Sequence, residues 1–323
     1  MTNPVHDVNW EQMPDMPVAK WEPASLVLDE KLYVLGGYEN YIISSRRLDV
    51  FNPTDGSWTQ LQDCPSRISH VDLVEGDTGF WFAGGMKDKP SKKVKDHIIA
   101  EVWHFDPELD RYTAAPLLPG PRGGGALERV GDHLHYISGL MEDRDTDSPD
   151  HFVFDLAAWS ATGSAEWTKA APLPAPRNQH SVAVLDNQIY VIGGQFNHDS
   201  QQLDQSRVDI YDPTSDTWSE GPPLPIAHSH SEGATFVHND RIWMAGGHRT
   251  PEGGKKGFCR NVVTLREGGE WEITCHLPKP ISSPAAAIIN DRLYVAGGWD
   301  GRMDDNKNWL SSPEVWVTSV KDL

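Results

Sequence analysis

The sequence predicts an all-β protein whose strands form a six-bladed β-propeller, and three observations support this fold. A short strand ending in a glycine pair recurs along the chain, as in "QIYVIGG" at 188–194. A Trp or Tyr that begins another strand follows at a regular distance. The composition, with 13 Trp, 28 Gly and 24 Pro in 323 residues, is typical of short strands joined by tight turns.

The glycine-ended strand occurs six times, at spacings of 48 to 55 residues. Its first glycine, replaced once by serine, stands at Gly36, Gly84, Ser138, Gly193, Gly246 and Gly297. A period of about 50 residues is typical of propellers, in which each repeat forms one blade. A glycine pair suits a strand beside a crowded axis, because it leaves room where a Cβ would clash and permits positive φ.

Each repeat is expected to form four strands, counted outward from the axis. In the fourth repeat these are the apolar "SVAVL" at 181–185, the glycine-ended strand, "DIY" at 209–211, and the strand of Trp218. The aspartate before proline in "DIYDP" marks the turn after the third strand. The same order applies to the other repeats.

The two ends of the chain complement each other. "NWEQMPDMP" at 9–17 is a Trp strand without a preceding repeat, whereas the last repeat stops after "EVWVTSV" at 314–320. We therefore expect a strand at about 8–14 to complete the blade formed by about 282–320. This closes the ring without a free strand edge and makes residues 1–323 a single domain.

Charge and cysteine content exclude several classes of function. The net charge of −19 repels nucleic acid and anionic membranes, so we expect neither as a partner. Neither a secretory signal nor a membrane-spanning segment is apparent, which favours a cytoplasmic protein. Three cysteines are too few and too irregularly spaced for a disulfide framework or a zinc motif.

Basic residues recur sixteen positions before the first glycine of each repeat. They are Lys20, Arg122, Arg177 and His230, with Arg67 added by a one-residue shift, while the last repeat has Ile281. Arginines that converge at one mouth of the ring would bind a carboxylate or phosphate. In the alternative interpretation, each arginine pairs with acidic residues of a neighbouring blade.

Further candidate ligand-binding residues come from the loops after the glycines and from the starts of the third strands. These are Tyr38, Gln195, His248, Trp299, Arg47 and Arg207. Tyr38 and Trp299 would give a flat apolar platform for a sugar or a peptide. The alternative is that these side chains only decorate the rim.

Two patterns raise the question of a metal. His70 and His180 could approach the axis, and Asp143, Asp147 and His151 follow one another at four-residue steps. A histidine three residues after an arginine, as at His70 and His180, can equally be a packing residue. Acidic loops produce four-residue spacings of this kind by chance. We therefore expect no metal and no cofactor.

The glycine pairs, the aromatic pairs Phe51 with Trp58 and Tyr211 with Trp218, and "PRNQHS" at 176–181 resemble Kelch repeats. The resemblance covers nearly the whole chain. It implies a binding module, because eukaryotic Kelch propellers bind acidic peptides through arginines placed in this way. The expected partner is thus an acidic protein segment or an anionic small molecule such as an acidic sugar.

An enzyme is the alternative that the resemblance leaves open. A propeller of this size is similar to the bacterial N-acetylneuraminate epimerases (mutarotases), which are isomerases of an acidic sugar. That resemblance implies an acid and a base, for which His180, His230 and Glu101 are candidates, and a carboxylate clamp, for which Arg122 and Arg177 are candidates. The sequence contains no local catalytic motif, so the binding interpretation is preferred.

Overall fold

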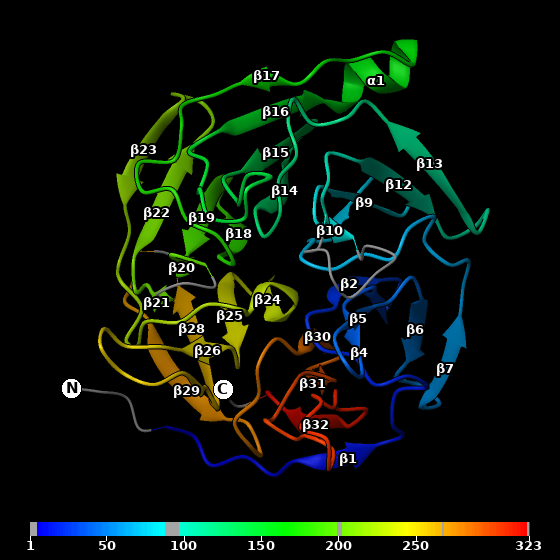
Figure 1. The fold of residues 1–323 in the computed structure, drawn as a ribbon, viewed down its shortest axis with the longest axis vertical. Coiled ribbons are helices and arrows are strands. Elements are labelled where there is room, and N and C mark those ends of the chain that lie inside the picture. The colour runs from blue at the N-terminus through cyan, green and yellow to red at the C-terminus, as the bar shows by residue number, and fades with distance from the viewer. Residues whose placement is uncertain (1–4, 88–96, 199–201, 267, 322) are drawn as a thin grey trace.

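A ring of six four-stranded antiparallel sheets forms the described part of the chain (Figure 1). The computed structural model describes residues 5–87, 97–198, 202–266, 268–321 and 323. The predicted all-β, six-bladed propeller is confirmed. No helix in these residues has the length and apolar character needed to cross a bilayer.

Each blade places its innermost strand beside the axis and its fourth strand at the perimeter. Blades 1 to 3 comprise β2 (Ala24–Leu28), β3 (Lys31–Leu35), β6 (Leu48–Asn52) and β7 (Ser57–Gln60); β8 (Val74–Glu75), β9 (Phe80–Ala83), β12 (Val102–Asp106) and β13 (Arg111–Ala115); and β14 (Ala126–Val130), β15 (His133–Ile137), β16 (His151–Asp155) and β17 (Thr168–Lys169). Blades 4 to 6 comprise β18 (Ser181–Leu185), β19 (Gln188–Ile192), β22 (Val208–Asp212) and β23 (Thr217–Glu220); β24 (Thr235–His238), β25 (Arg241–Ala245), β28 (Asn261–Arg266) and β29 (Glu272–His276); and β30 (Ala285–Ile289), β31 (Arg292–Ala296), β32 (Val315–Ser319) and β1 (Glu11–Met13).

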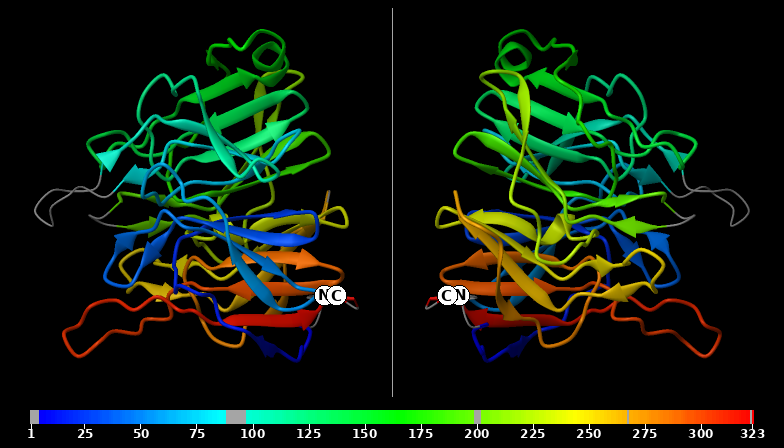
Figure 2. Two further views of the ribbon diagram at one scale, coloured as in Figure 1. Left: turned by 90° about the vertical axis from the view of Figure 1, so that its right-hand side faces the viewer. Right: turned by 90° about the vertical axis from the view of Figure 1, so that its left-hand side faces the viewer.

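Short hairpins follow four of the glycine-ended strands and project from one face of the ring, here called the loop face (Figure 2). They pair β4 (Tyr38–Glu39) with β5 (Ile43–Ser44), β10 (Met86–Lys87) with β11 (His97–Ile98), β20 (Gln195–Phe196) with β21 (Leu203–Asp204), and β26 (His248–Arg249) with β27 (Gly257–Phe258). The opposite face, the turn face, carries the turns that join first to second strands. The C-terminal segment lies there, with the Val320 amide donating to Asp291 O.

The turns between first and second strands explain the Asp and Asn residues at these positions. Asp186 and Asn187 both have positive φ, of 51° and 58°, and Asn290 and Asp291 repeat this geometry at 51° and 55°. A two-residue hairpin turn of this hand matches the twist of its strands and favours Asn, Asp and Gly. The sequence therefore sets a tight turn that holds the innermost strand against the second.

The glycine pairs are required by both space and conformation. In blade 1, Gly36 and Gly37 have φ of 62° and 76°, and a Cβ on Gly37 would lie 2.6 Å from Pro23 N. Ser138 replaces glycine in blade 3 with φ 61°. Its Oγ lies 2.7 Å from the carbonyl oxygens of both Ser148 and Arg177 and donates its one proton to either of them, which helps to hold the left-handed conformation.

Outer-strand tryptophans fasten neighbouring blades. Trp58 lies opposite Phe51 in the sheet, with ring centroids 5.0 Å apart. Several indole nitrogens donate to the segment that leaves the preceding blade: Trp167 to Pro116 O at 3.0 Å, and Trp218 to Ala171 O at 2.8 Å. The repeated Trp thus joins blades as well as filling their cores.

The insertion in the third repeat forms α1 (Leu156–Thr162) at the perimeter. Asp155 caps its first turn by accepting from the Ala158 amide at 2.8 Å, and Gly163 ends the helix with φ 68°. The helix lies beside the blade, so the four-strand order is kept.

The N-terminal strand closes the ring, as predicted. Strand β1 pairs with β32 through Glu11 and Val317, Gln12 and Trp316, and Met13 and Val315. It is shorter than the expected 8–14. Trp10, just before it, donates to His276 O at 2.9 Å and so links blade 6 to blade 5.

Candidate functional site

One set of hydrogen bonds defines equivalent positions in all six blades. The amide of each second glycine donates to a carbonyl at the entry of the next blade. The six accepting residues, here called the anchor residues, are Lys20, Ile68, Arg122, Arg177, His228 and Ile281. The sequence alignment is therefore wrong in two blades, since Ile68 replaces Arg67 and His228 replaces His230.

The shift in blade 5 has a visible cause. His228 precedes Gly246 by 18 residues rather than sixteen, and the 3₁₀ helix η1 (Glu232–Ala234) accommodates the extra residues before β24. His230 consequently lies two positions past the anchor residue. Arg67 lies one position before its anchor residue and donates to Ser44 O at 2.8 Å.

The basic anchor residues are buried and paired inside their own blades. The side chain of Arg177 is fully buried, and its guanidinium contacts Asp209 at 2.7 Å and donates to Gly193 O at 2.6 Å. Lys20 is equally buried and lies 2.9 Å from Asp49. The charges of these two anchor residues are thus compensated inside the blade. Their side chains point toward its second and third strands.

The predicted third-strand cations share the same acidic partners. Arg47 contacts Asp49 at 2.7 Å, and Arg207 contacts Asp209 at 2.6 Å. In blade 3, Arg122 pairs with Asp150, whose other oxygen lies 2.8 Å from Lys169. Each acid therefore lies between two cations in its own blade rather than in a neighbouring blade. The sequence signal for the pairs in blades 1 and 4 is Arg-x-Asp at the start of the third strand.

A second ring of residues lies two positions past the anchor residues, around the axis. It comprises Glu22, His70, Gly124, Gln179, His230 and Ser283, all with φ between 45° and 60°. Four of the amides donate to the next member: Glu22 to Ser283, Ser283 to His230, His230 to Gln179, and Gln179 to Gly124, at 2.7 to 3.2 Å. We call these six residues the axial ring. Sequence reasoning missed it, although the anchor spacing could have located it.

Polar side chains of the axial ring form a buried network. The Glu22 carboxylate lies 3.3 Å from His70 Nε2 and 3.6 Å from His230 Nε2. Ser229 Oγ lies 2.6 Å from His230 Nδ1 and donates to Asp204 at 2.7 Å. Burial lowers the pKa of both histidines well below the usual value, so both are neutral at pH 7.

The three candidate acid–base residues lie in different surroundings. His180 is fully buried, and burial lowers its pKa to about 3. His230 stacks on His248 at 3.8 Å within the axial network. Glu101 accepts from Lys87 and from Trp103 Nε1 at the start of the third strand of blade 2. Within the described residues, none of the contacts joins any two of the three.

The predicted aromatic platform is packed inside the loop face. Tyr38 and Trp299 are 4% and 6% exposed and surround Trp21, while Trp309 stacks on Trp299 at 4.1 Å. Gln195 is also buried and donates to Asn178 Oδ1 at 2.9 Å. These side chains support the loops and present little surface to a ligand.

One exposed apolar surface lies beside this cluster, at the tip of the β4–β5 hairpin. Tyr41, Ile42 and Ile43 are 50%, 42% and 41% exposed, and Met303 in the adjoining loop of blade 6 is 48% exposed. We call these four residues the hairpin patch. The Tyr41 amide donates to Trp309 O at 2.9 Å, and Trp309 pairs with Met303, so one strand contact links the two loops.

The structure separates the residues of the four-step acidic pattern. Asp143 accepts from Thr146 in its own turn, Asp147 accepts from Asn178 at 2.7 Å, and His151 lies buried against His135 at 2.9 Å. In the described part of the chain, no group of three or more His, Cys, Asp or Glu side chains is arranged to hold a metal ion.

Comparisons with known proteins agree with the repeat pattern. A family model described as "KLHDC2/KLHL20/DRC7 Kelch-repeats domain" matches residues 117–298, and the Kelch motif matches residues 22–65 and 280–320. The chain belongs to the Kelch-repeat family.

Individual relatives are distant. A Kelch repeat-containing protein of Arabidopsis thaliana is 24% identical over 98% of this chain and 78% of its own length. The Kelch-like protein terF of Aspergillus terreus is 29% identical over 63% of this chain, and Kelch repeat and BTB domain-containing protein 12 of Danio rerio is 27% identical over 69%. The chain spans only 45% and 39% of the lengths of these last two proteins.

A solved structure titled "Structure of YjhT" has the same fold. It superposes with a TM-score of 0.76 over 96% of this chain and 97% of its own, at 15% sequence identity. This likeness concerns the fold.

Proposed function

We propose that this propeller is a protein-binding module whose contact surface is the hairpin patch on the loop face. The observation that carries the proposal is an apolar hairpin tip held in an unfavourable backbone conformation. Tyr41 and Ile42 have φ of 68° and 57°, a region that β-branched residues rarely occupy. The resemblance to Kelch propellers that bind peptides supports the same conclusion.

Folding alone gives no reason for these residues at this position. Asn or Gly would form the turn without strain, and a polar side chain would avoid exposing apolar surface. Strain of about 1 kcal/mol per residue persists where the surrounding structure imposes it. Here the Ser311 amide donates to Asn40 at 2.9 Å and helps to fix the tip against blade 6. A fixed apolar tip binds a partner with little loss of conformational entropy.

The nature of the partner follows from the available side chains. An anionic ligand would compete for Arg122 and Arg177 with Asp150 and Asp209, which already bind them. An apolar protein segment needs no such exchange. The three cysteines are free thiols, from which we infer a partner in the reducing cytoplasm.

The test is a comparison of the wild type with Ile42→Asn. Asparagine tolerates positive φ, so we expect the free energy of unfolding to rise by about 1 kcal/mol while affinity for the partner falls at least tenfold. Proteins retained by the immobilised wild type from an extract of the source organism are identified, and the affinity of the purified partner is then measured.

Leu117→Ser is the matched control, since it removes an exposed apolar side chain (62% exposed) from the outer edge of the ring. The control should retain the partner at wild-type affinity. Equal retention by the wild type and the Ile42→Asn variant would overturn the proposal.

A further inference from the structure

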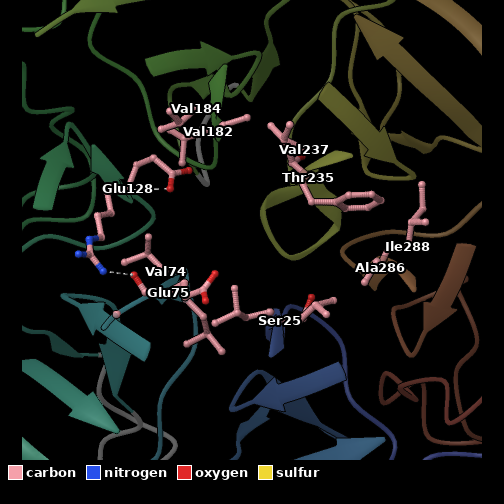
Figure 3. A pocket seen from close by; sticks show the side chains of 18 of the residues that line it. Ser25, Val74, Glu75, Glu128, Val182, Val184, Thr235, Val237, Ala286 and Ile288 are labelled. Atoms are coloured by element: carbon pink, nitrogen blue, oxygen red, sulfur yellow. Dashed lines mark hydrogen bonds between the residues drawn. The ribbon is translucent and has the colours of Figure 1, made fainter. Parts of the chain in front are cut away.

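A cavity of about 660 Å³ lies on the axis and is lined by all six innermost strands (Figure 3). Most of its lining comes from the middle of these strands and none of it from the hairpin patch, so the two sites are distinct. The volume falls within the range of small-molecule sites in proteins.

Apolar side chains form most of the cavity wall. Val184, Val237 and Ile288 surround the same space in Figure 3. Val237 is 41% exposed, and Phe236 on the same strand is only partly buried. Apolar surface left open to water inside a ring favours an occupant with an apolar body.

The lining holds two carboxylates and one cation, Arg129, so its formal charge is negative. Glu128 accepts only the amide of Arg129, at 3.1 Å. The guanidinium of Arg129 donates instead to Gly131 O at 2.8 Å and pairs with Asp77. Glu75 adds a second carboxylate to the lining. An anion beside an apolar wall is stabilised by a cationic group that enters with its own apolar part.

Unpaired polar atoms lie farther along the axis, toward the loop face. A small polar cavity of about 20 Å³ is lined by Gln179, Asp72 and Glu232 among others. Gln179 is 2% exposed, and its Nε2 has no hydrogen-bond partner in the described residues. Glu232 Oε1 is likewise without a partner there. These groups indicate that a polar molecule completes the hydrogen bonding at the loop-face end of the axis. We call the axial cavity and this small polar cavity together the channel.

Burial is the main cause of the raised pKa values of two carboxyl groups along the axis. Burial, together with the charges of Glu232 and Glu128, raises the pKa of Asp72 well above its usual value. Burial raises the pKa of Glu128 to about 7. A bound cation would favour the ionised form of these carboxyl groups, whereas a bound anion would disfavour it.

We propose that the axial cavity binds a small organic cation with an apolar body. Its ammonium or guanidinium group lies beside Glu128, and its apolar part contacts Val184, Phe236 and Val237. The site is separate from the protein-binding function proposed above, because it lies on the other side of the axial ring.

Three probes that share an indole body test the charge preference. Isothermal titration at pH 7.5 compares tryptamine, which is cationic, with indole and with anionic indole-3-propionate. We expect saturable 1:1 binding of tryptamine, at least tenfold tighter than that of indole, and no measurable binding of indole-3-propionate. Equal binding of the anion, or no saturable binding of any probe, would overturn the proposal.

Variants distinguish the cavity from the acidic surface as a whole. Glu128→Gln keeps the shape and the bond to the Arg129 amide, and we expect it to weaken tryptamine binding about tenfold. Glu108→Gln, which removes an exposed carboxylate from the turn between β12 and β13, is the matched control and should bind like the wild type.

A steric variant supplies an independent readout. Val237→Trp fills the channel and should abolish binding of both tryptamine and indole, with the melting temperature confirming the fold. Should Glu128→Gln and Glu108→Gln bind tryptamine equally well, the amine binds the acidic surface and the cavity proposal is refuted, whatever the behaviour of the tryptophan variant.

Discussion

Arg177 uses each nitrogen of its guanidinium inside its own blade. Nε donates to Gly193 O, one terminal nitrogen contacts Asp209 and Ala175 O, and the other donates to Val191 O at 3.0 Å. These bonds connect the entry of blade 4 to its second and third strands. Such a residue stabilises the blade, and its replacement removes the buried one of the two cations beside Asp209.

We expect Arg177→Ala to lower the free energy of unfolding by about 3 kcal/mol, because Asp209 keeps only Arg207 and the buried carbonyls of Gly193 and Val191 lose their donor. Arg67→Ala removes a single hydrogen bond at a partly buried site and should cost less than about 1 kcal/mol. Urea unfolding followed by tryptophan fluorescence measures both. Wild-type stability of Arg177→Ala would instead favour an arginine that is free for a ligand.

Sequence reasoning located these cations but could not decide their role. The spacing from the glycines placed Lys20, Arg122 and Arg177 correctly at the anchor residues. Their acidic partners come from the third strand, about thirty residues later, and distance along the chain gives no measure of ion pairing. The strained tip at Ile42 was missed because positive φ at a β-branched residue has no compositional signal.

Among the elements, the entries to the innermost strands differ most between blades. Four blades begin this strand four residues after the anchor residue, but in blade 5 the strand begins at Thr235, after η1. The glycine and turn signals predicted the regular strands well, since each has a local backbone cause. The extra turn was not predicted, because two added residues change the spacing without changing the motif.

This extra turn carries Glu232, whose pKa burial raises to about 8. A carboxyl whose folded pKa lies above its unfolded value contributes full stability below about pH 4.5 and loses it as the pH rises toward 8. We therefore expect Glu232→Gln to be within about 1 kcal/mol of the wild type at pH 5 and to be more stable by up to about 4 kcal/mol at pH 8.

Urea unfolding at pH 5, 6.5 and 8 measures this difference in the free energy of unfolding. Glu108→Gln is the exposed control, and its difference from the wild type should not change with pH. A difference between Glu232→Gln and the wild type that does not change with pH would contradict the assignment.

In the whole molecule, closure depends on a strand from the other end of the chain. Strand β1 covers the edge of β32, and Met13 and Met16 pack with the core shared by blades 6 and 1. The complementary ends of the sequence predicted this pairing, because each end lacked what the other supplied. Repeat counting therefore settled the architecture, whereas the chemistry of the two faces depends on side chains that do not repeat.

Removal of residues 1–13 should open the ring. We expect the free energy of unfolding to fall by more than about 3 kcal/mol, and the bare edge of β32 to promote self-association. Chemical unfolding and light scattering test this, with Gln12→Ala as the control that keeps the backbone pairing. A truncated chain that stays monomeric with an unchanged unfolding midpoint would contradict the role of β1 in closure.

The hydrogen bonds of the axial ring have a mechanical consequence. Ser283, His230 and Gln179 each donate one backbone amide hydrogen bond and accept another at their carbonyl. These bonds link the inner ends of successive blades to one another. Outward movement of any one of these blades would break two bonds at the centre as well as its contacts at the sides. The blades that carry these three residues therefore resist moving apart singly.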